Sequence, residues 1–153
     1  MAKEIERKFL VNPSTIPFEG TGDELMQGYL SITESGLTRI RVTDKEGFLT
    51  IKSNTIGISR DEYEFAIPFD DAKRLIKLSQ GEIIHKTRTE VNYDGKIWEI
   101  DEFHGKNEGL WLAEIELATS NESFSKPEWV LEEVSEDERY FNSNLSIKPF
   151  CEW

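Results

Sequence analysis

The chain has 153 residues, of which 31% are charged and 37% hydrophobic, and its net charge is −12 at pH 7. These values fit a soluble globular protein with one domain, residues 1–153; they argue against a broad nucleic-acid surface, which needs clustered Lys and Arg, and against a membrane span, which needs ~20 consecutive apolar residues. With no signal peptide in view and a single cysteine, Cys151, the protein is expected in the cytoplasm.

Eight segments alternate polar and apolar residues with period two, the pattern of half-buried strands. In chain order they are residues 2–11, 24–32, 37–44, 47–53, 60–67, 82–93, 96–104 and 110–118. The connections carry turn residues, among them Asp94-Gly95, a strong signal for a two-residue hairpin. Eight strands joined mostly by hairpins predict an antiparallel barrel or sandwich.

Residues 69–81 predict a helix between the fifth and sixth strands. Asp70 or Asp71 would cap its start, apolar residues recur along one stripe, and Gly81 would end it. Segments near 127–133 and 135–147 are expected to form short helices over the strands. The predicted fold class is therefore α+β, mainly antiparallel β, with a few peripheral helices.

Charged side chains occupy alternate positions in seven of the eight predicted strands, and the opposite positions are apolar. The acidic positions are Glu4, Glu6, Glu62, Glu64, Glu90, Glu99, Asp101, Glu114 and Glu116, and the basic ones are Lys8, Arg39, Arg41, Lys52, Lys86 and Arg88. Like charges thus recur ~7 Å apart, where they repel by roughly 0.6 kcal/mol in water. A sheet with one wet face explains such alternation in any single strand. The like-charged pairs, and the segregation of the two signs by strand, favour a different arrangement.

A sheet that closes with its ionic face inward would explain why like charges are placed close together. Clustered carboxylates bind a hard divalent cation, and clustered Arg and Lys bind phosphate oxygens. The interior of an eight-stranded barrel has room for one small ligand. We therefore predict a closed eight-stranded tunnel with a polar, charged lumen that holds a metal–polyphosphate. Its apolar face would point outward, partly under the helices at 69–81 and near the C-terminus.

The same residues carry a family likeness. "EIERK" near the start resembles the Glu-x-Glu-x-Lys signature of the CYTH group, the triphosphate tunnel metalloenzymes. The likeness continues in order through "TRIRVT", "LTIK", "EYEF", "HKTR", "IDEFHGKNEGLWLAEIEL" and "DERYFNSNLS". It covers nearly the whole chain, and the ordered set is far more specific than the first motif alone.

The resemblance implies a tunnel of eight antiparallel strands that acts on a triphosphate with Mg²⁺ or Mn²⁺. By position, it implies metal-side acids at Glu4, Glu6, Glu114 and Glu116, with further acids, as ligands or water holders, at Glu62, Glu64, Glu99 and Asp101. It implies phosphate binders at Lys8, Arg39, Arg41, Lys52, Lys86 and Arg88, joined by Arg139 from the C-terminal segment. Lys86, steered by Tyr29, matches the lysine that some relatives are thought to use as general base.

Our mechanistic hypothesis is an in-line attack by water on a terminal phosphorus. Glu4, Glu6 and Glu116 would hold one metal. Lys86 would act as the base if nearby cations lower its pKa from ~10.4; a phosphate clamp is the plainer role. His85 and His104 are expected to be surface or hydrogen-bonded residues, and no histidine ligand set is evident.

The leading hypothesis for the reaction is hydrolysis of inorganic tripolyphosphate, because the short chain leaves no extra domain or obvious base-recognition pocket. Thiamine and nucleoside triphosphates stay open as substrates. A class IV-type adenylate cyclase is the enzymatic alternative, although the start "MAKEIERK" lacks the His-Phe pair typical of that branch. The third hypothesis is a polyphosphate-binding module without turnover. The protein would act on a small molecule, as a monomer or a homodimer.

Overall fold

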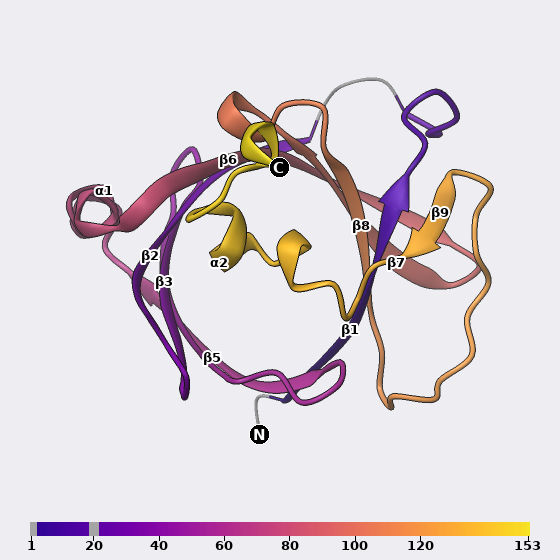
Figure 1. The fold of residues 1–153 in the computed structure, drawn as a ribbon, viewed down its shortest axis with the longest axis horizontal. Coiled ribbons are helices and arrows are strands. Elements are labelled where there is room, and N and C mark those ends of the chain that lie inside the picture. The colour runs from indigo at the N-terminus through magenta and orange to yellow at the C-terminus, as the bar shows by residue number, and fades with distance from the viewer. Residues whose placement is uncertain (1–2, 19–21) are drawn as a thin grey trace.

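A closed antiparallel barrel of eight strands forms the body of the protein (Figure 1). The computed structural model describes residues 3–18 and 22–153. The strands are β1 (Lys3–Val11), β2 (Asp23–Thr33), β3 (Gly36–Val42), β4 (Gly47–Ser53), β5 (Ser59–Ile67), β6 (Gln80–Tyr93), β7 (Lys96–Phe103) and β8 (Trp111–Glu116). They follow the order β5-β4-β3-β2-β6-β7-β8-β1, and pairing of β1 with β5 closes the ring. The predicted eight-stranded closed tunnel is confirmed.

The strand boundaries differ from those predicted by up to two residues, and Ala2, the first predicted strand residue, lies outside the described residues. The hairpin predicted at Asp94-Gly95 joins β6 to β7. Both residues have positive φ, 51° and 78°, as a type I′ turn requires. Period two and turn chemistry therefore locate the whole barrel along the chain.

A ninth strand was not predicted. The segment near 127–133, expected to be helical, contains the strand β9 (Val130–Glu133). β5 covers only the first residues of β1, pairing as far as Ile5, so the rest of that edge of β1 is open to another partner. β9 takes it, with Phe9 opposite Glu133 and Val11 opposite Val130. The helix prediction is wrong because this edge offers backbone hydrogen bonds that local sequence does not reveal.

The predicted helix at 69–81 is present but shorter. It consists of α1 (Phe69–Leu75) and the 3₁₀ turn η1 (Ile76–Leu78), and β6 begins at Gln80. Its N-cap is Pro68, so the two aspartates expected to cap it lie in its first turn instead. Ala72 and Ile76 pack on Ile40 and Val42 on the outer surface of the barrel. No helix in the described part of the chain is long and apolar enough to cross a membrane.

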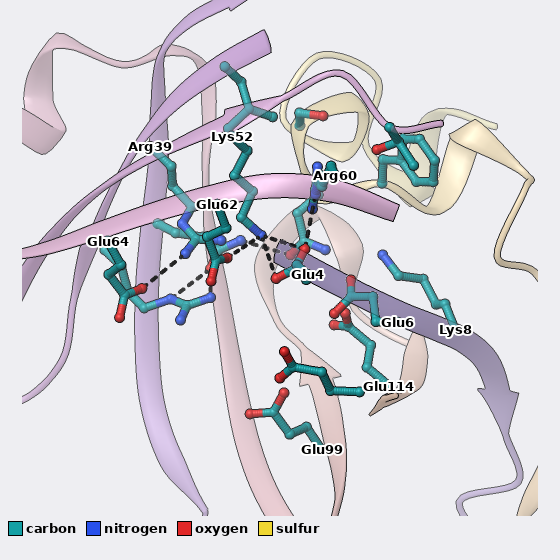
Figure 2. Close-up of a pocket in the computed structure, with 18 of the residues that line it drawn as sticks. Glu4, Glu6, Lys8, Arg39, Lys52, Arg60, Glu62, Glu64, Glu99 and Glu114 are labelled. Carbon is teal, nitrogen blue, oxygen red and sulfur yellow. Dashed lines mark hydrogen bonds and ion pairs between the residues drawn. The ribbon is translucent and has the colours of Figure 1, made fainter. Parts of the chain in front are cut away.

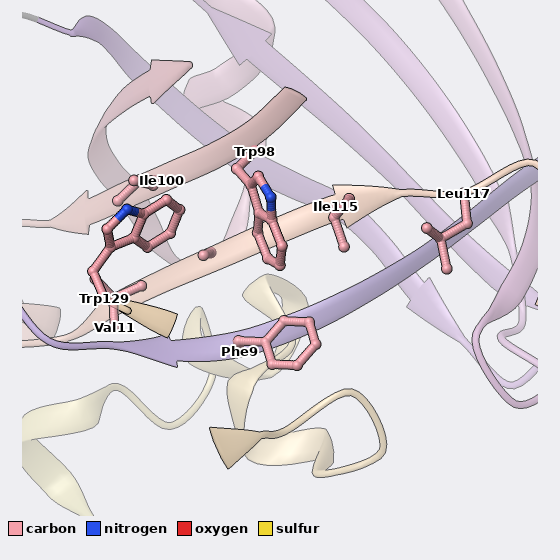
Figure 3. Packing of buried hydrophobic residues seen from close by; sticks show 8 residues of the cluster. Phe9, Val11, Trp98, Ile100, Ile115, Leu117 and Trp129 are labelled. Atoms are coloured by element: carbon pink, nitrogen blue, oxygen red, sulfur yellow. The ribbon is translucent and has the colours of Figure 1, made fainter. Parts of the chain in front are cut away.

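A second apolar cluster lies outside the barrel, over β1, β7 and β8 (Figure 3). Phe9, Trp98 and Ile115 are at most 1% exposed and pack with Trp129, which precedes β9. Trp98 meets Phe9 and Trp129 with ring centroids 5.5 and 5.6 Å apart. The apolar face of these strands thus points outward, as predicted, and the segment that leads to β9 covers it.

The C-terminal segment lies inside one end of the ring rather than over its outer face (Figure 1). It contains η3 (Glu138–Tyr140), α2 (Asn142–Leu145) and η4 (Phe150–Glu152), and η4 contacts η2 (Gly105–Asn107), the turn that joins β7 to β8. Tyr140 and Leu145 pack against Ile84, Phe103 and Leu112 from the inner faces of β6, β7 and β8. The expectation that the C-terminal helices cover the outer surface is therefore wrong: they fill one end of the lumen with apolar side chains and leave the charged part as a closed-ended cavity.

Candidate active site

A cavity of about 240 Å³ occupies the rest of the lumen, and all eight barrel strands contribute to its lining. Its acidic residues are Glu4, Glu6, Glu62, Glu64, Glu99, Glu114 and Glu116, and its basic residues are Lys8, Arg39, Arg41, Lys52, Arg60, Lys86 and Arg88. They gather here because alternate residues of a strand face one side of the sheet. Of the fifteen predicted charged site residues, thirteen line the cavity; Asp101 and Arg139 do not.

Glu4 is held between two cations (Figure 2). Its carboxylate lies 3.4 Å from Lys52 Nζ and 3.0 Å from Arg60 Nε, and Lys52 also pairs with Glu62 at 3.0 Å. Burial acts to raise the pKa of Glu4, but Lys52, a hydrogen bond with Glu62 and Arg60 outweigh it and lower that pKa to about 2. Sequence reasoning missed Arg60, although it precedes Glu62 by two residues and so shares its face of β5.

Glu6 on β1 and Glu116 on β8 are less well neutralised. Burial and the neighbouring carboxylates of Glu114 and Glu4 raise the pKa of Glu6 well above its usual value. Burial, Glu4 and Glu62 also raise the pKa of Glu116. Within residues 3–18 and 22–153, neither Glu6 nor Glu116 forms an ion pair within 4.0 Å. A group of oxygen donors with excess negative charge fits a hard divalent cation.

Asp101 lies beneath the basic side chains of the cavity and pairs with two of them. It is only 1% exposed. Arg88 donates to both carboxylate oxygens, at 2.7 and 2.8 Å, and Lys86 Nζ lies 2.9 Å away. Arg88 also reaches Glu99 at 3.2 Å and Glu114 at 3.4 Å. Asp101 was expected to be a further metal ligand or a water holder. Its carboxylate is instead paired with two cations, so its position suits anchoring Lys86 and Arg88.

Lys86 and the arginines carry charge in a buried place. Burial, with the nearby Arg88 and Arg41, lowers the pKa of Lys86 to about 7 although Asp101 opposes the change. Burial, Arg39 and Arg88 lower the pKa of Arg41 to about 10. Arg39 donates to Thr50 Oγ1 at 3.2 Å and pairs with Glu64 at 3.6 Å, while its buried Nε has no hydrogen-bond partner in the described chain. Lys86 and Arg41 therefore lack enough anionic neighbours to offset their burial, which is expected of side chains that bind an anion.

A chain of hydrogen bonds connects Lys86 to Tyr29, the residue expected to orient it. Asn142, on α2, accepts hydrogen bonds at 2.9 Å from both Lys86 Nζ and Gln27 Nε2. Gln27 also lies 3.2 Å from Tyr29 Oη, and its Oε1 accepts from Arg41 at 3.2 and 3.1 Å. Tyr29 is therefore connected to Lys86 by hydrogen bonds through Gln27 and Asn142. The sequence analysis did not identify Gln27 or Asn142. Gln27 could have been found, because it lies two residues before Tyr29 and so shares its face of β2, whereas nothing in the sequence marks Asn142.

Arg139 is not brought to the cavity. Its side chain is 61% exposed, pairs with Asp137 at 2.7 Å and stacks on Trp153 at 4.8 Å. The expectation that it reaches the tunnel is wrong, because the aspartate two residues earlier and a C-terminal aromatic ring hold it outside.

Comparison with known proteins agrees with this geometry. The model of the CYTH domain matches residues 2–147. Two curated relatives are each named inorganic triphosphatase: one from Acetivibrio thermocellus is 42% identical over 98% of this chain and 97% of its own, and one from Nitrosomonas europaea is 40% identical over 94% and 97%. A crystal structure described as an inorganic triphosphatase is 37% identical, covers 96% of both chains and superposes with a TM-score of 0.69.

Proposed function

The chain belongs to the CYTH domain family, and from that premise we propose that it is a metal-dependent hydrolase that cleaves inorganic tripolyphosphate to diphosphate and phosphate. One observation carries the proposal. Seven acidic and seven basic side chains face one cavity of about 240 Å³, where a cation and a polyanion are both needed to offset them. The relatives named inorganic triphosphatase support the choice of substrate.

The charge balance explains why the substrate should enter with a cation. A bare triphosphate would meet seven carboxylates as well as seven cations, so its net attraction to the cavity is small. Glu6, Glu114 and Glu116 would hold the metal, Mg²⁺ or Mn²⁺, with Glu4 and Glu62 at their side. When bound, such an ion offsets charge on phosphate oxygens and orients them. Glu64 and Glu99 stay paired with Arg39 and Arg88 and position those arginines.

The basic residues would bind the phosphate oxygens. Arg39, Arg41 and Arg88 present planar forks that suit two oxygens at once, and Lys8, Lys52 and Arg60 add further donors along the wall. Held this way, a terminal phosphorus faces an in-line water. The water oxygen forms a bond to that phosphorus, the bridging P–O bond breaks and its electron pair leaves with diphosphate, while one water proton passes to a base.

Lys86 is our candidate for that base. Nζ is fixed by Asp101 and Asn142, and burial lowers the pKa of Lys86 to about 7, so near neutral pH a large share of the amines has a lone pair to accept a proton. In the alternative role, the protonated amine clamps a phosphate oxygen. The two roles predict opposite pH profiles: hydrolysis rises with pH through the pKa if Lys86 is a base and falls if it is a clamp.

The other candidate reactions fit the cavity less well. Fourteen of its 23 lining residues are charged, which suits an all-phosphate ligand better than the base and ribose of a nucleotide or the thiamine ring. A binding module without turnover would gain nothing from seven carboxylates beside phosphate. We place the reaction in the cytoplasm because the single cysteine, Cys151, cannot form an internal disulfide. We expect a monomer or a homodimer.

A substrate panel tests the proposal. The purified chain is incubated with tripolyphosphate, ATP or thiamine triphosphate plus Mg²⁺ or Mn²⁺, and phosphate and cyclic AMP are measured. We expect phosphate from tripolyphosphate at the highest kcat/KM, and none when the metal is chelated. Cyclic AMP from ATP would favour the cyclase, and tight binding with no product would favour the binding module.

A further inference from the structure

A second group of metal-ligating side chains lies outside the barrel. Glu24 on β2, His85 on β6 and His104, which follows β7, each offer one ligand atom, and these atoms all lie within 4.8 Å of one another. Nothing in the sequence indicated this grouping, and the two histidines are hydrogen-bonded as expected. Nothing in the reaction proposed above uses these residues, and the site depends on none of its assumptions.

Strand register brings the three side chains together. Met26 lies opposite His85 and Glu24 opposite Thr87 in the β2–β6 pair, while Lys86 lies opposite Phe103 in the β6–β7 pair. His104 donates its backbone N–H to the carbonyl of His85 at 3.0 Å. Because Lys86 points into the cavity, its neighbours in β6 point outward. The group is thus on the far side of the wall that carries Lys86.

Contacts among the side chains already hold the three residues close together. The imidazole of His85 contacts the carboxylate of Glu24, and the rings of His85 and His104 have centroids 4.7 Å apart. The hydroxyl of Thr87 lies 3.0 Å from Glu24 Oε1 and 2.7 Å from His104 Nε2. A hydroxyl that contacts two of three ligands holds their orientation, as supporting groups do around metal centres. Three hydrogen-bonded strands supply a rigid frame for it.

We propose that Glu24, His85 and His104 form a surface site for one divalent transition-metal ion, of which Zn²⁺ is the best match. Two imidazole nitrogens and one carboxylate oxygen are a ligand set typical of Zn²⁺ with water in the fourth position. Mg²⁺ and Ca²⁺ prefer oxygen ligands alone, so this site and the acidic lumen select different metals. The side chains of Glu24 and His85 are 58% and 42% exposed, which leaves the site open to an ion from solution.

The chain contains only two histidines, which makes the test unambiguous. Untagged protein is titrated with Zn²⁺ in excess Mg²⁺, which competes for oxygen ligands but not for imidazoles. The imidazole resonances are followed by NMR alongside calorimetry. We expect one equivalent of Zn²⁺ to shift both imidazoles, and Mg²⁺ alone to shift neither. His85→Ala and His104→Ala should each weaken Zn²⁺ binding by about 10-fold to 100-fold.

Matched variants separate this site from the lumen. Glu24→Gln keeps the side-chain size and should weaken Zn²⁺ binding, whereas Glu132→Gln, at an exposed position of β9, should not. Glu6→Gln, within the lumen, should leave the imidazole shifts unchanged. Equal Zn²⁺ affinity in wild type and Glu24→Gln, or binding that moves no imidazole resonance, would overturn the proposal. If either histidine variant fails to fold, the Glu24→Gln and Glu132→Gln pair decides alone.

Discussion

Glu6 on β1 and Glu114 on β8 direct their carboxylates at each other inside the barrel (Figure 2). Burial makes the repulsion between the two carboxylates costly, and burial and repulsion together raise the pKa of Glu6. The pKa of Glu114 lies well below its usual value in spite of burial, because Lys8, a hydrogen bond with Glu6 and Arg88 all lower it. The pair is therefore stable only with a shared proton or a cation beside it. This relationship links the stability of the ligand-free protein to the chemistry of its site.

Glu6→Gln should stabilise the ligand-free protein and remove turnover. It replaces a buried acid that must take up a proton or bind a cation with a neutral amide of similar volume, so we expect the melting temperature without metal to rise by about 2–4 °C. Hydrolysis of tripolyphosphate should fall by at least about 100-fold, because the metal loses a ligand. Thermal scans and phosphate assays check both effects. Glu128→Gln, at an exposed position, is the control and should change neither.

Arg39→Ala and Arg139→Ala should behave oppositely. Arg39 lines the cavity and is 5% exposed, so its loss should reduce kcat/KM for tripolyphosphate by on the order of 100-fold. Arg139 is held outside by Asp137, so its substitution should leave kcat/KM within about twofold of wild type. Steady-state kinetics decide, with circular dichroism to confirm folding. A large loss in the Arg139 variant would mean that the Arg139 side chain reaches the cavity during turnover.

Lys86 should make stability depend on pH above neutrality. Its pKa is about 7 in the folded chain and near 10.5 when unfolded, so between these values the unfolded state binds the extra proton. The free energy of unfolding must then increase with pH, by at most about 1.4 kcal/mol per unit. Urea denaturation at pH 7 and pH 9.5 measures this gain. It should shrink in Lys86→Met, where Arg88 still pairs with Asp101, and persist in Lys77→Met, at an exposed lysine of η1. Equal gains in all three proteins would refute the buried-lysine assignment.

Asn142→Ala should act through Lys86. Without its Oδ1 acceptor, Lys86 Nζ and Gln27 Nε2 lose a shared partner, and the amine is less well positioned. We expect kcat to fall about tenfold or more with a smaller change in KM, and the pH at which kcat is half-maximal to shift. Asn144→Ala is matched in size and lies on the same helix, where its amide binds the carbonyl of Glu138. A KM effect as large as the kcat effect, or an equal loss in Asn144→Ala, would contradict a positioning role.

The barrel and its charged lumen could be predicted because period two is a local property of the sequence. Glu4, Glu6 and Lys8 occupy alternate positions of one strand, so if one of them points into the barrel the other two do so as well. Arg60 obeys the same rule beside Glu62, so the sequence does contain the signal that places it in the cavity. The local rule is sufficient for every residue that a strand presents to the cavity.

The remaining features depend on contacts between distant segments. β9 forms because β5 leaves part of the β1 edge open, and Asn142 enters the site because α2 packs inside the ring through Leu145. The group of Glu24, His85 and His104 requires the register of three strands. Neither periodicity nor a motif contains that information, so these features become visible only in three dimensions.

We infer that cation and triphosphate bind together in the lumen, where each offsets the charges that the other leaves unpaired. Isothermal titration with imidotriphosphate, a tripolyphosphate analogue with nitrogen bridges, measures this directly in the presence and absence of Mg²⁺. We predict one equivalent bound at least about 100-fold more tightly with Mg²⁺, a difference of roughly 3 kcal/mol, and loss of that difference in Glu6→Gln. Equal affinity with and without Mg²⁺ in the wild-type protein would contradict the account.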